Sequence, residues 1–155
     1  MITLIGELNH PYIFTFKIKH MGFFDQLFNT KPTQSENTTK ASNFTWRTLE
    51  DITQLNALEK LSEEKLVVIF KHSVTCGISN MVWHQFQNEI DFNNDYIEML
   101  YLDLLAHRDI SNEITRRFQV LHQSPQILVI KNAEVLHHAS HSAIHISDIK
   151  RFLPE

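Results

Sequence analysis

The spacing of apolar residues alternates from residue 44 onward between continuous runs and positions three or four apart. Continuous runs and short alternating segments predict strands at 44–49, 66–70, 96–102, 127–130 and 134–138. Apolar positions three or four apart predict helices at 51–61, 78–90, 110–118 and 147–153. The β-branched run at 66–70 is typical of a central strand that is buried on both faces.

Two of these helices carry more specific expectations. The helix at 78–90 has its apolar stripe on Ile78, Val82, Phe86 and Ile90. Ser111 is predicted to cap the helix at 110–118, because serine favours helix N-termini.

The order of the elements, βαβαβαββα, predicts the fold class. Strands that are separated by helices pair in parallel, and helices then cover both faces of the sheet. The short connection Lys131-Asn132-Ala133 predicts that the last two strands form an antiparallel hairpin. The expected fold is therefore α/β, with a central mixed sheet flanked by helices in the thioredoxin-like arrangement.

The first 43 residues differ from the rest of the chain. Residues 1–20 lack the basic-then-apolar order of a secretory signal, so we expect a cytoplasmic protein. An amphipathic pattern begins at Met21, and we predict that translation starts there. Residues 29–43 hold one small apolar side chain, Ala41, and are predicted to be a flexible linker. The predicted domains are an N-terminal extension at 1–43 and a thioredoxin-like domain at 44–155.

Composition narrows the classes of function. The 155 residues carry a net charge of −4, which disfavours nucleic-acid binding because phosphate contacts usually need a basic face. The chain contains one cysteine, Cys76, which excludes an internal disulfide, a two-cysteine redox switch and a cysteine-rich zinc site. The thiol is therefore either a buried apolar group or a lone reactive one.

Cys76 lies between the predicted central strand and the helix that follows it. A thiol at a helix N-terminus is close to unpaired backbone N–H groups and to the positive end of the helix dipole, which favour the thiolate. Lys71 or His72 would add positive charge if they face the same loop. The alternative is an inert, small apolar residue. The position of Cys76 favours the nucleophile.

Gly77 and Ser79 are the neighbours of Cys76 that bear on its chemistry. Gly77 is the only glycine between residues 44 and 155, and it either lets a ligand approach closely or is a turn residue. Ser79 stands where a Cys-x-x-Cys enzyme keeps its second thiol. A hydroxyl cannot resolve a disulfide, so Ser79 either caps the helix or donates a hydrogen bond to the sulfur.

Pro125 precedes the strand at 127–130. About 5% of X-Pro bonds are cis, so frequency alone predicts a trans bond there. His137, His138, His141 and His145 crowd the end of the last strand. No carboxylate accompanies them at a helical ligand spacing, and we predict no metal site.

Topology gives two further residues a place near Cys76. The loop that holds His141 and the loop that holds Arg108 are both expected at the sheet edge on which Cys76 lies. Arg108 would there bind a ligand carboxylate, or else be an ordinary solvated arginine.

Three motifs in this order resemble those of the monothiol bacilliredoxins, the YtxJ-like redox proteins of the bacillithiol system. The motifs are Lys71-His72-Ser73 with residues 75–79, then residues 122–127, then Glu134-Val135 with residues 138–142 and Ile144. The resemblance covers about residues 44–153. It implies a thioredoxin-like fold in which Pro125 is a cis proline packed beside Cys76. Members of the family usually carry proline where this chain has Gly77.

The resemblance also implies a reaction, the removal of bacillithiol from S-bacillithiolated proteins. Cys76 and Ser79 would be the catalytic residues, and His122 or His141 would assist as proton donors. The implied substrate-binding residues are Thr75, Gly77, Ile78, His122, Ser124, Pro125 and His141. Bacillithiol would be the thiol co-substrate, with no tightly bound cofactor and no metal. The implied partners are S-thiolated client proteins, without nucleic acid or membrane, and the implied state is a monomer or weak dimer.

Three other functions compete with this one. A related enzyme would use another thiol, such as glutathione or coenzyme A. A redox-inactive module of the same fold would bind a partner at the sheet edge, with Cys76 incidental. A monothiol iron–sulfur carrier would hold a cluster between two chains.

Overall fold

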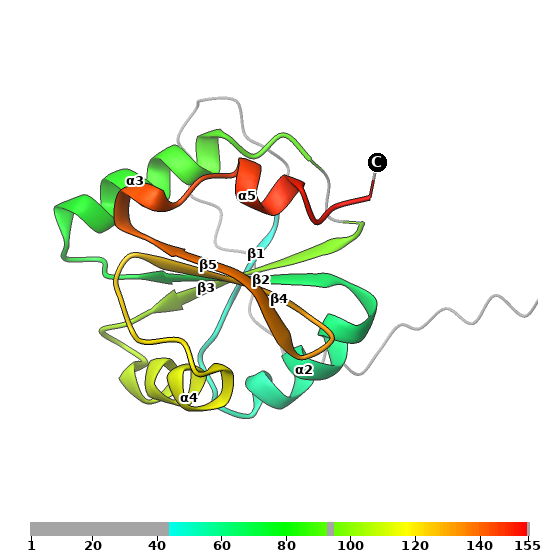
Figure 1. Ribbon diagram of the computed structural model, residues 1–155. Helices are drawn as coiled ribbons and strands as arrows, with labels where there is room; N and C mark the ends of the chain where they lie inside the picture. Colours follow the sequence, from blue (N-terminus) through cyan, green and yellow to red (C-terminus); the bar gives the residue numbers. More distant parts are fainter. Residues whose placement is uncertain (1–43, 93–94, 155) are drawn as a thin grey trace, which may run out of the picture.

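The computed structural model describes residues 44–92 and 95–154, so the predicted start at Met21 and the predicted linker at 29–43 lie outside the described residues. Strands and helices alternate along the described chain except for the last two strands, which form a hairpin (Figure 1). The strands are β1 (Trp46–Thr48), β2 (Leu66–His72), β3 (Ile97–Asp103), β4 (Gln126–Lys131) and β5 (Glu134–Ser140). The helices are α2 (Gln54–Glu64), α3 (Gly77–Asn88), α4 (Arg108–Phe118) and α5 (Ser147–Lys150), with a 3-10 turn η1 (His141–Ala143).

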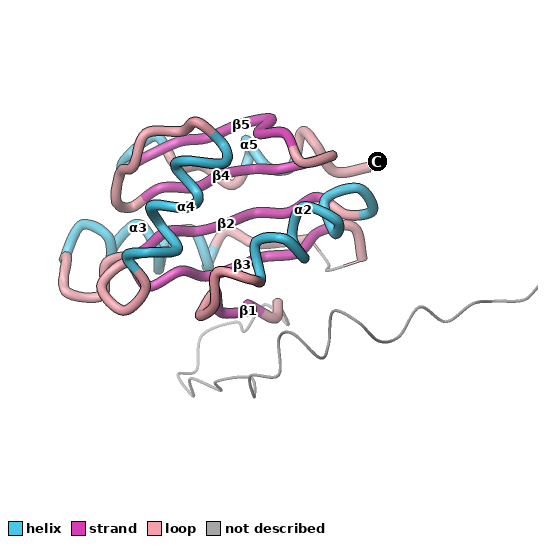
Figure 2. Tube along the Cα trace, turned by 90° about the horizontal axis from the view of Figure 1, so that it is seen from below, coloured by secondary structure: helices cyan, strands magenta, loops and turns pink. Residues whose placement is uncertain are grey.

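The strands form one sheet in the order β1-β3-β2-β4-β5, as Figure 2 shows. β1 and β2 are both parallel to β3, because helices connect them. β4 is antiparallel to β2, and β5 is antiparallel to β4. The mixed sheet with helices on both faces confirms the predicted α/β, thioredoxin-like fold class.

Two hydrophobic cores cover the two faces of the sheet. Alternate residues of a strand point to opposite faces, so Val67 and Ile69 pack with residues of α2 and α4. Val68 and Phe70 pack on the other face with residues of α3 and α5. Figure 1 shows α3 and α5 above the sheet and α2 and α4 below it. Because helices cover both faces, β2 is buried along its whole length.

The structure corrects three predicted details. Ile78 is 60% exposed, so the buried stripe of α3 begins at Val82, one turn later than predicted. Ser111 does not cap α4, because that helix begins three residues earlier, at Arg108. α5 ends at Lys150 rather than at residue 153. Beyond Lys150 the chain continues in i→i+3 turns, in which the N–H of Phe152 donates to the carbonyl of Ile149 and the N–H of Leu153 to that of Lys150.

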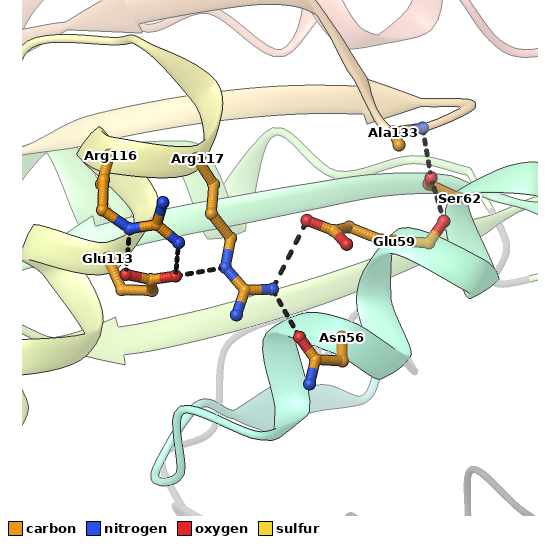
Figure 3. A network of polar contacts seen from close by, with 7 residues as sticks. All are labelled: Asn56, Glu59, Ser62, Glu113, Arg116, Arg117 and Ala133. Atoms are coloured by element: carbon orange, nitrogen blue, oxygen red, sulfur yellow. Dashed lines mark hydrogen bonds and ion pairs between the residues drawn. The ribbon is translucent and has the colours of Figure 1, made fainter.

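A polar network joins α4 to α2 on the lower layer (Figure 3). Glu113 accepts hydrogen bonds from Arg116 Nε at 2.7 Å and from Arg117 Nε at 2.6 Å. Arg117 Nη1 donates across to Asn56 Oδ1 of α2 at 2.7 Å and lies 3.4 Å from Glu59 Oε1. The pKa of Glu113 is lowered to about 2, first by the hydrogen bonds from Arg116 and Arg117.

This network predicts a pH dependence of stability. Because the folded pKa of Glu113 lies below the unfolded value of 4.5, its contribution is complete above pH 4.5 and is lost as the pH falls towards 2. We expect the urea midpoint of a Glu113→Gln variant to fall less than that of the native protein over this range. Glu134→Gln, at an exposed carboxylate of β5, is the control. Equal pH dependence in all three proteins would contradict the prediction.

Candidate active site

The ends of several elements meet at one edge of the sheet, on the left in Figure 1. β2 ends there and leads through Cys76 into α3. β4 begins at the same edge because it runs antiparallel to β2, and β5 ends there in η1. The backbone N–H of His141 donates to the carbonyl of Pro125 at 3.0 Å. The edge therefore carries Cys76, Pro125 and His141, as the sequence predicted.

Cys76 is the N-cap residue of α3 and is half-buried. Its backbone is extended, with φ −96° and ψ 118°, and its carbonyl accepts a hydrogen bond from the N–H of Asn80 at 2.9 Å. No side chain caps the N-terminus of α3. The free N–H groups of the first turn and the helix dipole therefore act on the Cys76 side chain, where they stabilise negative charge.

Ser79 is fully buried and points away from solvent into the protein. Its Oγ lies 2.7 Å from His72 Nδ1 and accepts a hydrogen bond from the backbone N–H of Ser73 at 3.1 Å. The hydroxyl is thus engaged by two partners at the end of β2. Among the described residues the hydroxyl therefore neither caps α3 nor contacts the sulfur, the two roles that the sequence suggested. It fastens the first turn of α3 to the end of β2.

His72 forms part of the buried floor beneath this loop. Its ring packs among the rings of Trp83 and Tyr101, with centroid distances of 5.9 and 5.6 Å. Burial lowers the pKa of His72, so the neutral ring predominates at neutral pH. His72 therefore supplies no positive charge to the Cys76 loop, which corrects one of the two sources expected from the sequence.

Lys71, the other expected source of charge, faces the opposite side of the sheet. It is fully buried, and its Nζ donates to Gln126 Oε1 of β4 at 2.9 Å. This pair was not predicted from the sequence. The available signal was a lysine and a glutamine within otherwise apolar strands.

The loop before β4 has three features that bear on ligand binding. The Ser124–Pro125 peptide bond is cis, so the resemblance was right where frequency alone was wrong. Ser124 Oγ is buried and has no hydrogen-bond partner among the described residues. His141, which bonds to the carbonyl of Pro125, has a left-handed backbone with φ 56°.

His122 and Arg108 lie at the α4 side of the same edge. His122 is exposed, and its Nδ1 lies 3.0 Å from the hydroxyl of Ser111. Burial of the ring, with the charges of Lys71 and Arg108, lowers the pKa of His122, so its ring is less often protonated at neutral pH than that of an ordinary histidine. Arg108 is exposed at the first position of α4.

A small apolar groove lies between α3 and η1. It has a volume of about 120 Å³, and Ile78 and Met81 form one wall with exposed fractions of 60% and 63%. His141 and His145 line the other wall. Thr75, before the cysteine, is exposed as well. Thr75, Ile78 and His141 are thus exposed at the end of the sheet on which Cys76 lies.

Gly77 is the first residue of α3, and a Cβ built on it would have no atom within 4 Å. Among the described residues, no atom therefore lies so close to Gly77 that only a glycine would fit at this position. Proline is favoured at the first position of a helix, where its ring fixes φ and no hydrogen bond is lost. The space around Gly77 is open to a ligand.

We expect Gly77→Pro to raise the free energy of unfolding by about 0.4–1 kcal/mol, because it restricts the unfolded chain. Urea denaturation measures the change, and Gly77→Ala, which leaves φ less restricted, serves as the comparison. A loss of stability in Gly77→Pro would show that the glycine has a conformational role.

Two classes of site are not found in the part of the chain that the structure describes. Within 44–92 and 95–154, no three His, Cys, Asp or Glu side chains gather in a way that would hold a metal ion. None of the helices described is both long and apolar enough to cross a lipid bilayer.

Comparisons with solved structures agree with the fold. A proposed oxidoreductase with a thioredoxin fold is 29% identical, with a TM-score of 0.58, and the match covers 68% of this chain and 91% of that one. The thioredoxin of Malassezia sympodialis is 16% identical with a TM-score of 0.55, covering 74% and 92%. The thioredoxin of Schistosoma mansoni is 20% identical with a TM-score of 0.53, covering 70% and 95%. The last two show the fold alone.

The fold and the lone thiol at a helix N-terminus define a thiol oxidoreductase of the thioredoxin-like class. Residues 47–149 match the family described as monothiol bacilliredoxin BrxC. The chain belongs to this family.

Proposed function

We propose that this thiol oxidoreductase removes bacillithiol from S-bacillithiolated proteins by exchange at Cys76. The observation that carries the proposal is the single half-buried thiol at the uncapped N-terminus of α3, in a chain of the monothiol bacilliredoxin family. Since the chain has no other cysteine, a mixed disulfide on Cys76 has to be resolved by an external thiol.

The proposed reaction has two exchange steps. The thiolate of Cys76 attacks the bacillithiol sulfur of the client's mixed disulfide, so that the client leaves as a thiolate and takes up a proton. Bacillithiol is now disulfide-bonded to Cys76. A second bacillithiol thiolate attacks the bacillithiol sulfur of this bond, which frees Cys76 and yields bacillithiol disulfide. One S–S bond breaks and one forms in each step.

The surroundings of Cys76 support this assignment of roles. The exposed backbone around Thr75 and Gly77 leaves room for a ligand on the sulfur. The backbone beside Pro125 and the unpartnered hydroxyl of Ser124 would hold an extended ligand. The groove of Ile78 and Met81 would receive an apolar side chain of the client.

His122 and His141 are proposed to exchange protons with the departing thiolate. Both are exposed at the edge that carries Cys76. The lowered pKa of His122 reduces its protonated fraction at neutral pH and limits it as a donor. Ser79, whose hydroxyl is engaged by His72 and Ser73, is proposed to act by positioning the first turn of α3.

Intact-mass spectrometry tests the proposal directly. After incubation with bacillithiol disulfide, we expect the protein to gain the mass of one bacillithiol, and added bacillithiol to remove it. The Cys76→Ala variant should gain nothing, because it lacks the only thiol. An S-bacillithiolated client should be released as free thiol by the native protein and not by the variant.

Parallel incubations with glutathione disulfide and coenzyme A disulfide separate the competing functions. An adduct with one of these and none with bacillithiol would contradict the proposal in favour of another thiol. No adduct with any of the three would favour a redox-inactive binding module.

A further inference from the structure

Lys71 is a buried cation at a position where packing alone would favour an apolar side chain. It lies in the middle of the sheet, fully buried, on the face where its neighbours Val67 and Ile69 form the core. Among residues 44–92 and 95–154, Lys71 forms no ion pair. Its ammonium donates a hydrogen bond to the neutral amide of Gln126. Burying a charge without a counter-ion lowers stability. Such a group is a candidate for function.

Gln126, the side chain that Lys71 contacts, forms hydrogen bonds with the loop before β4. Gln126 Oε1 accepts from Lys71 Nζ and, at 3.4 Å, from the backbone N–H of Gln123. Gln126 Nε2 donates to the carbonyl of Leu121 at 2.9 Å. One amide therefore ties both ends of the 121–123 segment to the central strand, immediately before Ser124 and Pro125.

The ammonium group anchors the oxygen of this amide. A protonated lysine has three donors and no acceptor, so it requires the oxygen of Gln126 to face it. The N–H of Gln123 and the carbonyl of Leu121 favour the same orientation. A neutral amine donates a weaker hydrogen bond than an ammonium does, and it would hold the amide less firmly.

The charged groups around Lys71 do not offset its burial. His122 and, behind it, Arg108 are the cationic or titratable groups on the loop and α4 side. On β3 its partner is Leu102, and the following Asp103 acts on His72 and on Tyr101. At the start of α2, the exposed Asp51 bonds to Thr53.

Burial therefore lowers the pKa of Lys71 from 10.5 to about 8. The charged form predominates at neutral pH and is lost under mildly alkaline conditions. Because the folded pKa is the lower one, the buried charge destabilises the fold to its full extent below pH 8, and this cost declines as the pH rises from 8 to 10.5.

We infer that Lys71 is a positioning residue of the exchange reaction: its buried ammonium anchors the side chain of Gln126 to the central strand and thereby holds the 121–124 loop in the conformation that receives an extended mixed-disulfide substrate. This inference rests on the proposed function. Lys71 and Gln126 determine the conformation of the binding loop, whereas Cys76 provides the reacting sulfur.

The first test uses Lys71→Met, which keeps the length of the side chain and removes its charge and donors. We expect KM for an S-bacillithiolated client to rise about tenfold with little change in kcat, as for the loss of a binding interaction. Tm at pH 7 should stay constant or rise by a few degrees, because a buried charge is removed. Lys60→Met, at an exposed lysine of α2, is the matched control and should change neither quantity.

The pairing with Gln126 is tested by a double-mutant cycle. Gln126→Leu should raise KM as Lys71→Met does, and the double variant should be no worse than either single one, because both changes remove the same link. A Lys71→Met protein that loses Tm while keeping the native KM would overturn the inference. So would KM increases that multiply in the double variant.

A measurement without any substrate separates this inference from the proposed function. In the native protein, NMR resonances of the Gln126 side-chain amide and of the Gln123 backbone amide should shift with a midpoint near pH 8. Lys71→Met should show no such titration. If the native protein titrates but does not exchange with bacillithiol-blocked clients, the proposed function fails and the inference with it. If exchange occurs without the titration, only the inference fails.

Discussion

Residues 67–71 of β2 pair antiparallel with residues 126–130 of β4, and this pairing is the constraint on which the site depends. Cys76 lies at the edge of the sheet where β2 ends. β4 starts at that same edge because β4 runs antiparallel to β2. The register that places Lys71 opposite Gln126 also places the Ser124–Pro125 loop next to the turn that leads to Cys76. A shift of one residue would exchange the two faces of β4 and remove Gln126 from Lys71.

Buried polar pairs lie on both faces of β2 next to the site. On one face of β2, Lys71 and Gln126 support the loop before β4, and on the other face His72 and Ser79 support the first turn of α3. The two sides of the reactive edge are thus each fastened to the central strand by a buried hydrogen bond. Apolar residues would give a more stable core but would leave both loops without these bonds. In this account the protein keeps the buried polar groups for the shape of its site.

The sequence predicted the fold well because its signals were local and repeated. The continuous run at 66–70 and the spacing of Val82 and Phe86 depend on burial alone, and burial is what the structure shows. The sheet edge shared by Cys76, Pro125 and His141 followed from the direction of the strands. Ile78 was misjudged because its helical spacing fits the core, whereas the sheet edge ends before it and leaves it beside the groove.

The parts that sequence reasoning missed are contacts between distant polar residues. Lys71 and Gln126 are 55 positions apart, and their hydrogen bond exists only in the completed sheet. Ser79 was expected at the helix terminus or the sulfur, because the spacing does not reveal that His72 is buried and forms a hydrogen bond with the Ser79 hydroxyl. Ser111 looked like a cap because the apolar spacing starts at residue 110, whereas α4 begins at Arg108. Its hydroxyl lies against His122, which is likewise remote in the sequence.

The central claim is that the β2–β4 register builds one binding site from the Cys76 turn and the loop before β4. A crystal structure of the protein with bacillithiol disulfide-bonded to Cys76 tests it most directly. The account predicts that the ligand lies extended between Cys76 and the backbone of Ser124 and Pro125, with Lys71 still bonded to Gln126. A ligand that is ordered elsewhere and makes no contact with residues 121–126 would contradict it.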